Sequence, residues 1–444
     1  WYESNLAMRK DHLVANARLA RAAVEFGLDE YIVTKRFSSL QWHPEYVNEL
    51  IDMEKHIDRE ISTKTLADVV ESLIGASMLD GGLPKAISCM KLFLPELKWD
   101  SLENHRISLF ELSPKLELGS FYNPLQKLLG YSFKKPSLLV EAITHASYIS
   151  GLCSYERLEF LGDSILDYIV VQEIYPSGLS HMRMHELRTA FVNADLLAFL
   201  CMELHYNVEI TDLEVVKGQV SSQDAIKSPV YEYKKTPVAT KIPLYSFMRH
   251  DSEGILKAQA ETKRRYEKMR DEISCALESG ADYPWAALYG LRAEKFYSDI
   301  IEALLGAIWI DSGSLQVVAS VVERMRIIKL LRRAITENLN TEHPKITLGK
   351  LADTSQVRYE LSKDTDSTDG PELICKVLVD DEEVANVRGG VSRHDMETRA
   401  AIEAIDILKS KSEKQREKLK RPRDPEEKSG PSQSEKNEFM ARDW

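Results

Sequence analysis

An internal repeat is the feature of this sequence that most restricts how the chain can fold. Residues 64–82 read KTLADVVESLIGASMLDGG and residues 295–313 read KFYSDIIEALLGAIWIDSG. Identical residues occupy matched positions, namely Lys64, Asp68, Glu71, Leu73, Gly75, Ala76, Asp80 and Gly82 in the first copy and Lys295, Asp299, Glu302, Leu304, Gly306, Ala307, Asp311 and Gly313 in the second. The two segments lie too far apart for the period of a solenoid, so the repeat indicates a duplicated domain.

Both copies are predicted to be helical bundles. In the second copy, Phe296, Ile300 and Leu304 recur at the spacing of one helical face. Most of the chain through residue 338 has similar apolar spacing and few runs of β-branched residues. We therefore expect tandem all-α domains at residues 1–105 and 121–338, joined by a linker at residues 106–120.

The second copy carries an insertion. Asp299 follows Asn193 by 106 residues. The equivalent residues of the first copy, Asn16 and Asp68, are separated by only 52. The extra chain falls at about residues 214–282, which include the charged run KAQAETKRRYEKMRDE. Its polar composition predicts either a surface excursion or a partly disordered segment.

The pattern changes near residue 344. Residues 373–379 and 383–387 have the composition of strands, and residues 397–408 return to an amphipathic helix. These segments predict a small α+β domain, in the order α-β-β-β-α, at residues 344–410. The predicted fold class of the whole chain is therefore mainly α, with this small domain at its end.

The end of the chain, residues 411–444, is predicted to be a disordered tail because it is rich in Pro, Ser and Glu. A basic run at residues 409–423 overlaps it, with eight basic and two acidic residues. We expect this run to add salt-sensitive, sequence-independent affinity for a nucleic acid, since its cations would release counterions on binding.

Composition argues against several other classes of protein. No stretch is apolar over the ~18 residues that a membrane span needs, and no signal peptide opens the sequence, so we expect a cytoplasmic or nuclear protein. The five cysteines form no Cys-x-x-Cys pair, which argues against a disulfide framework or a zinc site. The net charge of −12 is only a weak objection to RNA binding, because basic contacts can be local. Because the chain opens with Trp1, we expect a fragment or a processed product.

Two pairs of acids are spaced to share a metal ion. Glu159 and Asp163 stand at i and i+4 in the segment ERLEFLGDSIL, so they share one helical face. Asp299 and Glu302 stand at i and i+3, and Lys295 precedes them by one turn. If the two helices pack face to face, the four carboxylates would need a cation to neutralise them. Ligands that are all oxygen favour Mg²⁺ or Mn²⁺.

A second interpretation treats these acids as solvated helix faces, paired with Arg157 and Lys295. Two features favour the metal site. Gly306 continues the face of Asp299, and its missing side chain would let another helix approach closely. Residues 156–164, ERLEFLGDS, resemble the nine-residue signature of the ribonuclease III family almost letter for letter.

The resemblance to ribonuclease III extends beyond the signature. LGY at residues 129–131 and THAS at residues 144–147 are similar to the family's opening helices. By position, the resemblance implies metal ligands at Glu159, Asp163, Asp299 and Glu302, and an active-site cation near the phosphate at Lys295. It implies hydrolysis of double-stranded RNA that depends on Mg²⁺ or Mn²⁺ and leaves 5′-phosphate and 3′-hydroxyl ends. The duplex would be selected by its A-form shape.

Two such domains followed by a small α+β domain resemble the Dicer family. That family implies small-RNA production in RNA silencing, an internal pseudo-dimer of the two nuclease domains, and dsRNA-binding or Argonaute-pathway proteins as partners. The helicase and end-binding domains of a complete Dicer are not in this sequence.

The first copy lacks a helix of the ERLEFLGDS type. Its Lys64, Asp68 and Glu71 would therefore form a second site that is incomplete. A double-strand cut needs one working site per strand, so we expect this chain alone to nick duplex RNA.

The C-terminal unit resembles a divergent dsRNA-binding domain. That family opens its second helix with a basic Ser-Lys-Lys-x-x-Lys cluster, whereas this chain has SRHDME at residues 392–397. Arg393 and His394 are the candidate RNA contacts, and a protein-docking role is equally open. For the whole chain, the competing function is a ribonuclease III fold that binds RNA or acts as a scaffold without cutting. The intact acids argue against that alternative, and the duplication argues against an unrelated helical protein.

Overall fold

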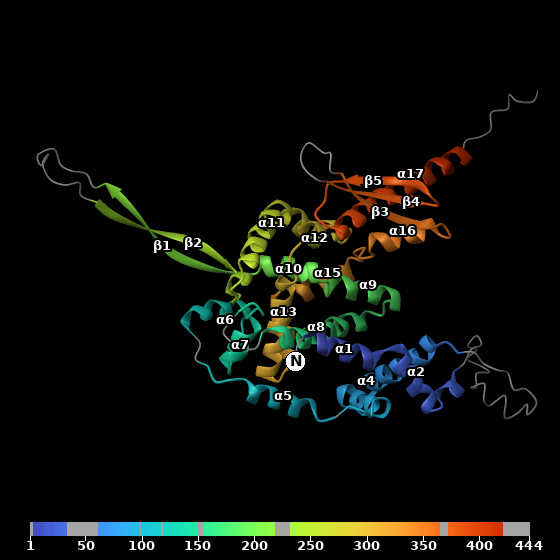
Figure 1. The fold of residues 1–444 in the computed structure, drawn as a ribbon, viewed down its shortest axis with the longest axis horizontal. Helices are drawn as coiled ribbons and strands as arrows, with labels where there is room; N and C mark the ends of the chain where they lie inside the picture. Colours follow the sequence, from blue (N-terminus) through green and yellow to red (C-terminus); the bar gives the residue numbers. More distant parts are fainter. Residues whose placement is uncertain are drawn as a thin grey trace, which may run out of the picture. The chain divides into compact units, whose positions relative to one another are not determined.

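The chain folds into two compact units, and each is described here by itself. The computed structural model describes residues 3–32, 61–97, 99–116, 119–148, 154–217, 231–364 and 372–420 (Figure 1). The first unit comprises residues 1–281 and 293–339, and the second comprises residues 282–292 and 340–444. Both copies of the repeat lie in the first unit.

The first copy is built around a pair of helices. Its elements are α1 (Glu3–Val14), α2 (Asn16–Glu25), the 3₁₀ turn η1 (Leu28–Tyr31) and α4 (Thr63–Phe93). Helices α2 and α4 pack together around a small buried core of Leu19, Ala22, Ala23, Ala67, Val70, Phe93 and Leu94. Ser62 caps α4, since its hydroxyl oxygen accepts a hydrogen bond from the amide of Thr65 at 3.1 Å. Helix α4 kinks at Gly82, where φ is +67°, a conformation that favours glycine.

The second copy surrounds one buried helix, α13 (Phe296–Ser312). Its other elements are η2 (Ser120–Tyr122), α6 (Asn123–Leu129), α7 (Pro136–Ala142), α8 (Glu156–Ile174), η3 (Tyr175–Ser177), α9 (His181–Phe191), α10 (Ala194–Glu203), β1 (His205–Lys217), β2 (Tyr231–Pro243), η4 (Leu244–Phe247), α11 (Glu253–Ser279), α14 (Leu315–Arg324) and α15 (Ile327–Thr336). Helix α13 packs against α7, α8, α10 and α14, and nearly all of its residues are buried. Any acid on α13 is therefore in the core of the domain.

The two copies of the repeat touch through α1 and α8. The ammonium of Lys10 in α1 lies 5.5 Å from the ring centroid of Phe160 in α8, close enough for a cation–π contact. The predicted internal pseudo-dimer requires an apolar interface between equivalent helix faces of the two copies, and it stays a prediction.

The predicted linker at residues 106–120 contains helical chain, which corrects that expectation. Helix α5 (Leu102–Leu112) covers its first part and packs against α13. Arg106 donates a hydrogen bond to the carbonyl oxygen of Ile310 at 2.8 Å. Ser101 caps the helix by accepting from the amide of Asn104 at 3.0 Å.

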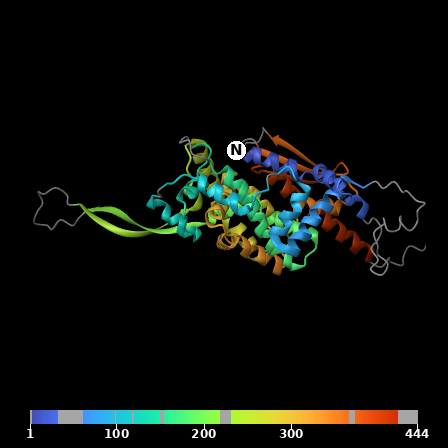
Figure 2. The same ribbon diagram turned by 90° about the horizontal axis from the view of Figure 1, so that it is seen from below.

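The insertion is more regular than its composition predicts. Strands β1 and β2 form an antiparallel ribbon, and α11 is a long helix. The outer part of the ribbon extends away from the helices of the same unit in both Figure 1 and Figure 2. The second copy is therefore not all-α. Alternating Val, Ile and Thr residues favour the extended conformation in these strands. Residues 218–230 lie outside the described part of the chain.

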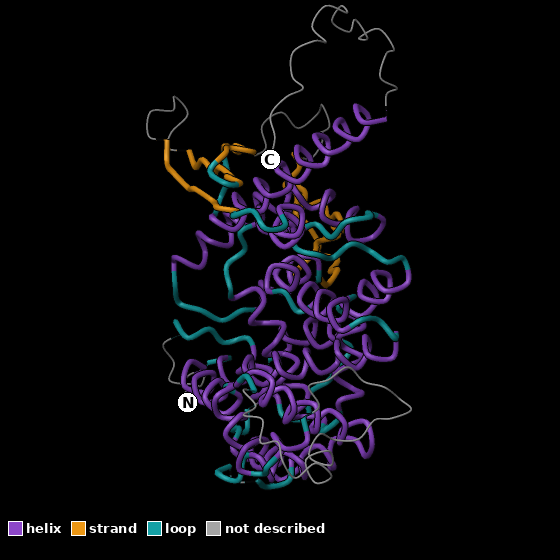
Figure 3. Tube along the Cα trace, turned by 90° about the vertical axis from the view of Figure 1, so that its right-hand side faces the viewer, coloured by secondary structure: helices purple, strands orange, loops and turns teal. Residues whose placement is uncertain are grey.

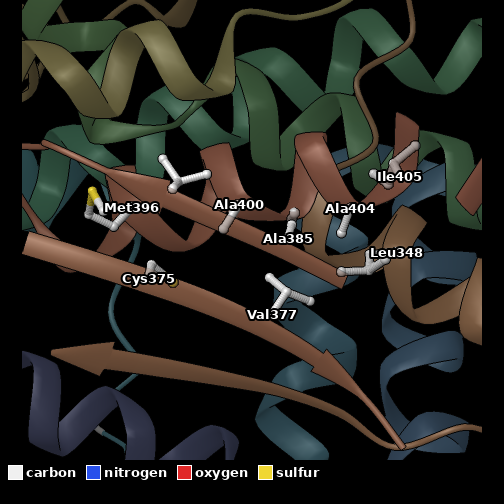
Figure 4. Close-up of a cluster of buried hydrophobic side chains, with 10 residues drawn as sticks. Leu348, Cys375, Val377, Ala385, Met396, Ala400, Ala404 and Ile405 are labelled. Carbon is white, nitrogen blue, oxygen red and sulfur yellow. The ribbon is translucent and has the colours of Figure 1, made fainter. Parts of the chain in front are cut away.

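The second unit confirms the predicted α-β-β-β-α domain. Its elements are α16 (Pro344–Ala352), β3 (Val357–Asp364), β4 (Glu372–Val379), β5 (Glu382–Arg388) and α17 (Arg393–Lys420), with the strands antiparallel in the order β3-β4-β5. Figure 3 shows these strands and the ribbon within a chain that is otherwise mostly helical. The core is formed by side chains of the sheet, α16 and α17 (Figure 4), namely Leu348, Cys375, Val377, Ala385, Val387, Met396, Ala400, Ala401, Ala404 and Ile405.

Two boundaries of this unit differ from the predictions. Helix α12 (Trp285–Leu291) belongs to it, although its neighbours in the sequence belong to the first unit. Helix α17 continues to Lys420, so residues 411–420 are helical rather than part of a disordered tail. The rest of the predicted tail lies outside the described residues. Within the part of the chain that is described, no helix is both long enough and apolar enough to cross a membrane.

Candidate active site

Two glycines let helices α8 and α13 cross in backbone contact. A Cβ built on Gly162 would lie 1.7 Å from the carbonyl oxygen of Glu302. A Cβ on Gly306 would lie 2.2 Å from the carbonyl oxygen of Leu158. No side chain fits at these distances, so the close approach expected at Gly306 is confirmed. The sequence alone does not reveal the matching role of Gly162, although this residue stands directly before Asp163 in the signature.

The crossing brings three of the four predicted ligands together. Glu159, Asp299 and Glu302 each offer a carboxylate oxygen within 4.8 Å of the other two. The three residues are only 5%, 4% and 9% exposed. Oxygen ligands at this spacing fit Mg²⁺ or Mn²⁺, which bind oxygen at about 2.1 Å. Asp163 is not a member of this group, and it follows Glu159 by one turn of α8.

Lys295 bridges the two helices that carry the acids. Its ammonium contacts the Oε1 atom of Glu159 and donates to Oδ1 of Asp299 at 2.9 Å. Burial alone would lower the pKa of Lys295, but its hydrogen bonds to the two carboxylates raise that pKa above its usual value. Three carboxylates and one ammonium leave a formal charge of −2, which one divalent cation would balance. The Lys295 side chain is 66% exposed, so solvent and ligands can reach it.

The acids are crowded enough to hold a proton when no cation is bound. Burial, together with the charges of the three other acids, raises the pKa of Glu302 to about 9. Burial also raises the pKa of Asp299, in spite of its hydrogen bonds with Lys295 and Tyr155. A divalent cation would displace the proton of Glu302, because a carboxyl group must ionise to bind a metal.

Tyr155 fixes the second oxygen of Asp299. Its hydroxyl donates to Oδ2 of Asp299 at 3.1 Å, while Lys295 takes Oδ1. Tyr155 is 5% exposed, and its ring packs edge-to-face against His145 at 5.8 Å between centroids. The sequence gives no signal for this contact except that Tyr155 directly precedes the signature.

Asp163 lies between the acidic group and the first copy of the repeat. Burial raises the pKa of Asp163, and the positive charge of Lys10 opposes that shift. The negative charge of Asp163 in turn contributes to the raised pKa of Glu302. The first copy thus places a cation beside the fourth predicted ligand.

The first copy assembles no equivalent group among the described residues. The ammonium of Lys64 lies 2.8 Å from Oδ2 of Asp68, and the two side chains are 72% and 48% exposed. Glu71 is exposed as well. A Cβ built on Gly75 would meet no atom within 4 Å, whereas the equivalent Gly306 is in backbone contact with α8. Among the described residues, no helix therefore packs on the face of α4 around Gly75 to supply acidic partners.

Arg393 and His394 have partners inside the second unit. Arg393 donates to Oε1 of Glu397 at 2.7 Å, and Lys345 donates to Oε2 at 2.6 Å. Burial alone would raise the pKa of Glu397, but these two hydrogen bonds lower it. The ring of His394 lies 5.8 Å from that of Tyr289 in α12. A buried acid therefore pairs with Arg393 at the start of α17 and with Lys345 in α16.

The helix crossing and its buried acids agree with a comparison to known families. The ribonuclease III domain model matches residues 1–82 and 156–313. The chain belongs to the ribonuclease III family. A model described as Dicer-like protein 2, dsRNA binding domain, matches residues 337–431.

Curated relatives point to one branch of this family. The chain is 41% identical over 428 residues to Dicer-like protein 2 of Cryphonectria parasitica, which covers 92% of this chain and 29% of that protein. It is 42% identical over 420 residues to Dicer-like protein 2 of Coccidioides immitis, which covers 93% of this chain and 28% of that protein. The chain spans less than a third of the length of these relatives.

Two solved structures were also matched. The nuclease domain of ribonuclease III from Campylobacter jejuni is 20% identical, with a TM-score of 0.27, and the match covers 47% of this chain and 96% of that one. Dicer from Pichia stipitis is 16% identical, with a TM-score of 0.24, and the match covers 66% of this chain and 97% of that one.

Proposed function

We propose that this chain hydrolyses double-stranded RNA with Mg²⁺ or Mn²⁺ and leaves 5′-phosphate and 3′-hydroxyl ends. The observation that carries the proposal is the buried group of Glu159, Asp299 and Glu302. Three buried acids that share a single ammonium are costly, and a purely structural domain gains nothing from the remaining negative charge. The dsRNA-binding domain model and the names of the relatives support duplex RNA as the substrate and RNA silencing as the process. Proteins of the dsRNA-binding or Argonaute class would be its partners.

The reaction we infer is direct attack of water on phosphorus. When bound by the three acids, a divalent cation would lower the pKa of a water molecule and offset charge on the phosphate. The water oxygen forms a bond to phosphorus, the bond to the 3′ oxygen breaks, and that oxygen takes up a proton. No covalent bond forms between the phosphate and Glu159, Asp299 or Glu302 in this reaction.

The surrounding side chains position the group. Lys295 holds Glu159 and Asp299 together, and its exposed ammonium is available to a non-bridging phosphate oxygen. Tyr155 holds the other oxygen of Asp299. Asp163 would complete the set of ligands, and the positive charges of Lys10, Arg188 and Lys295 favour its ionised form.

Cleavage of a labelled RNA duplex tests this proposal. The purified chain should cut the duplex with Mg²⁺ and leave it intact with a chelator, and the new ends should carry a 5′-phosphate and a 3′-hydroxyl. Asp299→Asn should abolish the cut while retaining duplex binding. If the chain binds the duplex but never cuts it with Mg²⁺ or Mn²⁺, the non-catalytic scaffold is the correct function.

A further inference from the structure

The insertion of the second copy builds a pocket of about 320 Å³ in the first unit. Its lining comes from the end of α10, the inner ends of β1 and β2, η4 and α11. All of the lining residues except Met202 lie between α10 and α13, where the second copy is longer than the first. The pocket is therefore formed mainly by the inserted chain and not by the repeated helices that carry the acids.

A buried carboxylate, paired with Arg270, positions one aromatic side chain of this pocket. The carboxylate of Glu203, whose side chain is 7% exposed, accepts from Nε of Arg270 at 2.6 Å and from Nη2 at 3.0 Å. The hydroxyl of Tyr266 donates to the same carboxylate. Bidentate pairing of this kind has a defined geometry. Because its hydroxyl is engaged, Tyr266 is left with its ring as the group that can contact a ligand.

Tyr245 supplies a second aromatic wall. It is half-buried, and its ring packs edge-to-face on Tyr297 with 5.3 Å between centroids. Tyr297 belongs to α13 and stands two residues before Asp299. Met202 and Pro243 add apolar surface to the lining. The pocket thus has the walls that a planar aromatic ligand needs.

Two lysines, Lys241 and Lys263, line the pocket together with the acid Glu267, on a chain whose net charge is −12. Lys241 is exposed, and none of the described carboxylates lies within ion-pair distance of it. Among the described carboxylates, only that of Glu267 lies within ion-pair distance of Lys263, at 3.9 Å, and both side chains are about 60% exposed. Exposed pairs of this length contribute little, so both ammonium groups are available to an anion.

We propose that this pocket binds one unpaired nucleotide of an RNA, with the base against Tyr245 and Tyr266 and the phosphate beside Lys241 and Lys263. Aromatic surfaces flanked by cations are how proteins hold single-stranded nucleic acid. The volume lies at the lower end of small-ligand pockets, which suits a single nucleotide. A paired base could not enter without first leaving its stack. The inference rests on the proposed function only for the identity of RNA as the polymer, because a free nucleotide has the same chemistry.

Binding measurements on the full chain test this inference. Two RNAs would be compared with a chelator present, a blunt duplex and the same duplex with a single-stranded extension. The wild-type chain should bind the extended RNA about tenfold more tightly, a factor within the range of one stacked base. The double variant Lys241→Glu, Lys263→Glu should lose that preference. Its matched control is Lys257→Glu, Lys268→Glu, two exposed lysines of α11 outside the pocket, which should keep the preference.

Three results would overturn the inference. The first is equal affinity of the wild-type chain for the two RNAs. The second is loss of the preference in the control as well as in the pocket variant, which would mean general charge attraction. The third is adenosine monophosphate binding that depends on Lys241 and Lys263 without any preference for extended RNA, which would mean a free-nucleotide site. Equal thermal unfolding midpoints of the two double variants would verify that both are folded.

Cleavage separates this inference from the proposed function. The pocket variant should still cut a blunt duplex with Mg²⁺, because Lys241 and Lys263 lie outside the acidic group. If the wild-type chain prefers extended RNA but never cuts, the inference about the pocket stands and the proposed nuclease activity is contradicted.

Discussion

Gly162 and Glu302 approach so closely that a Cβ on Gly162 would lie 1.7 Å from the carbonyl oxygen of Glu302. The same crossing places Gly306 against Leu158. The acids of the candidate site come from both helices, so the geometry of this site depends on two missing side chains.

Gly306→Ala should therefore destabilise the chain, by about 1–3 kcal/mol or more, since the new methyl group must push α8 and α13 apart. Gly75→Ala is its matched control at the equivalent position of the first copy. A Cβ there meets no atom within 4 Å, and Ala is favoured over Gly in a helix by about 1 kcal/mol. Thermal unfolding should show a lower midpoint for the first variant and an unchanged or higher midpoint for the second. Equal midpoints would contradict the observed crossing.

Metal binding should release protons near neutral pH. The pKa of Glu302 is about 9 in the metal-free fold, above the ordinary value of about 4.3 for an unfolded chain. Protonation of Glu302 thus stabilises the metal-free fold fully below the unfolded pKa, and this contribution is lost as the pH rises towards 9. Binding of Mg²⁺ requires the ionised form, so its affinity should rise between pH 6 and pH 9.

Calorimetric titration with Mg²⁺ in buffers of different ionisation enthalpy measures this proton release. The wild-type chain and Glu71→Gln should release the same number of protons at pH 7, because Glu71 is outside the acidic group. A wild-type titration whose heat does not depend on the buffer would contradict the raised pKa of Glu302.

Tyr155→Phe should weaken metal binding without unfolding the domain. The substitution removes the hydrogen bond to Oδ2 of Asp299 and keeps the buried ring. Loss of one such bond costs about 0.5–1.5 kcal/mol, or roughly twofold to tenfold in affinity. Tyr131→Phe is the control, because the Tyr131 hydroxyl donates to Asp311 at the far end of α13, at 2.6 Å. It should lower stability and leave Mg²⁺ affinity unchanged, and an equal loss of affinity in both variants would argue against a positioning role for Tyr155.

Glu397→Gln should increase the RNA affinity of the chain. Glu397 neutralises Arg393 and Lys345, so removing its charge would free these cations for phosphates. The affinity for duplex RNA should rise severalfold, and its salt dependence should steepen by about one phosphate contact. Glu403→Gln, at an exposed position of the same helix, should change neither quantity by a comparable amount. If both variants behave alike, the start of α17 does not meet RNA, and the docking of a protein becomes the better interpretation of this domain.

The parts of the fold that the sequence predicts are those with a strong local signal. Repetition identifies the equivalence of Asp68 with Asp299, and apolar spacing identifies α13 as a helix. Burial is harder to predict from the sequence. Helix α8 looks amphipathic, yet both Leu158 and Glu159 are buried in it. The sequence predicts four acids as one set of metal ligands. The i, i+4 spacing of Glu159 and Asp163 does not reveal that Asp163 lies outside the group formed by Glu159, Asp299 and Glu302.

Contacts between distant segments were the hardest features to predict. Tyr155 reaches Asp299 across 144 residues, and α12 packs in the second unit although the chain on both sides of it belongs to the first unit. The ribbon was not predicted because the charged residues of the insertion obscure the alternation of its strands. None of these three features can be predicted from hydrophobic periodicity, because periodicity describes one helix or strand at a time.

The central claim is that the second copy holds the only complete set of acids among the described residues, and strand-resolved cleavage tests it most directly. A duplex RNA carrying a different label on each strand would be incubated with Mg²⁺ and the wild-type chain, Glu302→Gln or its equivalent in the first copy, Glu71→Gln. Both substitutions remove one negative charge and preserve the size of the side chain. The account predicts that the wild-type chain nicks one strand per binding event, that Glu302→Gln does not cut, and that Glu71→Gln cuts like the wild type. Staggered cuts in both strands by the wild-type chain, or undiminished cutting by Glu302→Gln, would contradict it.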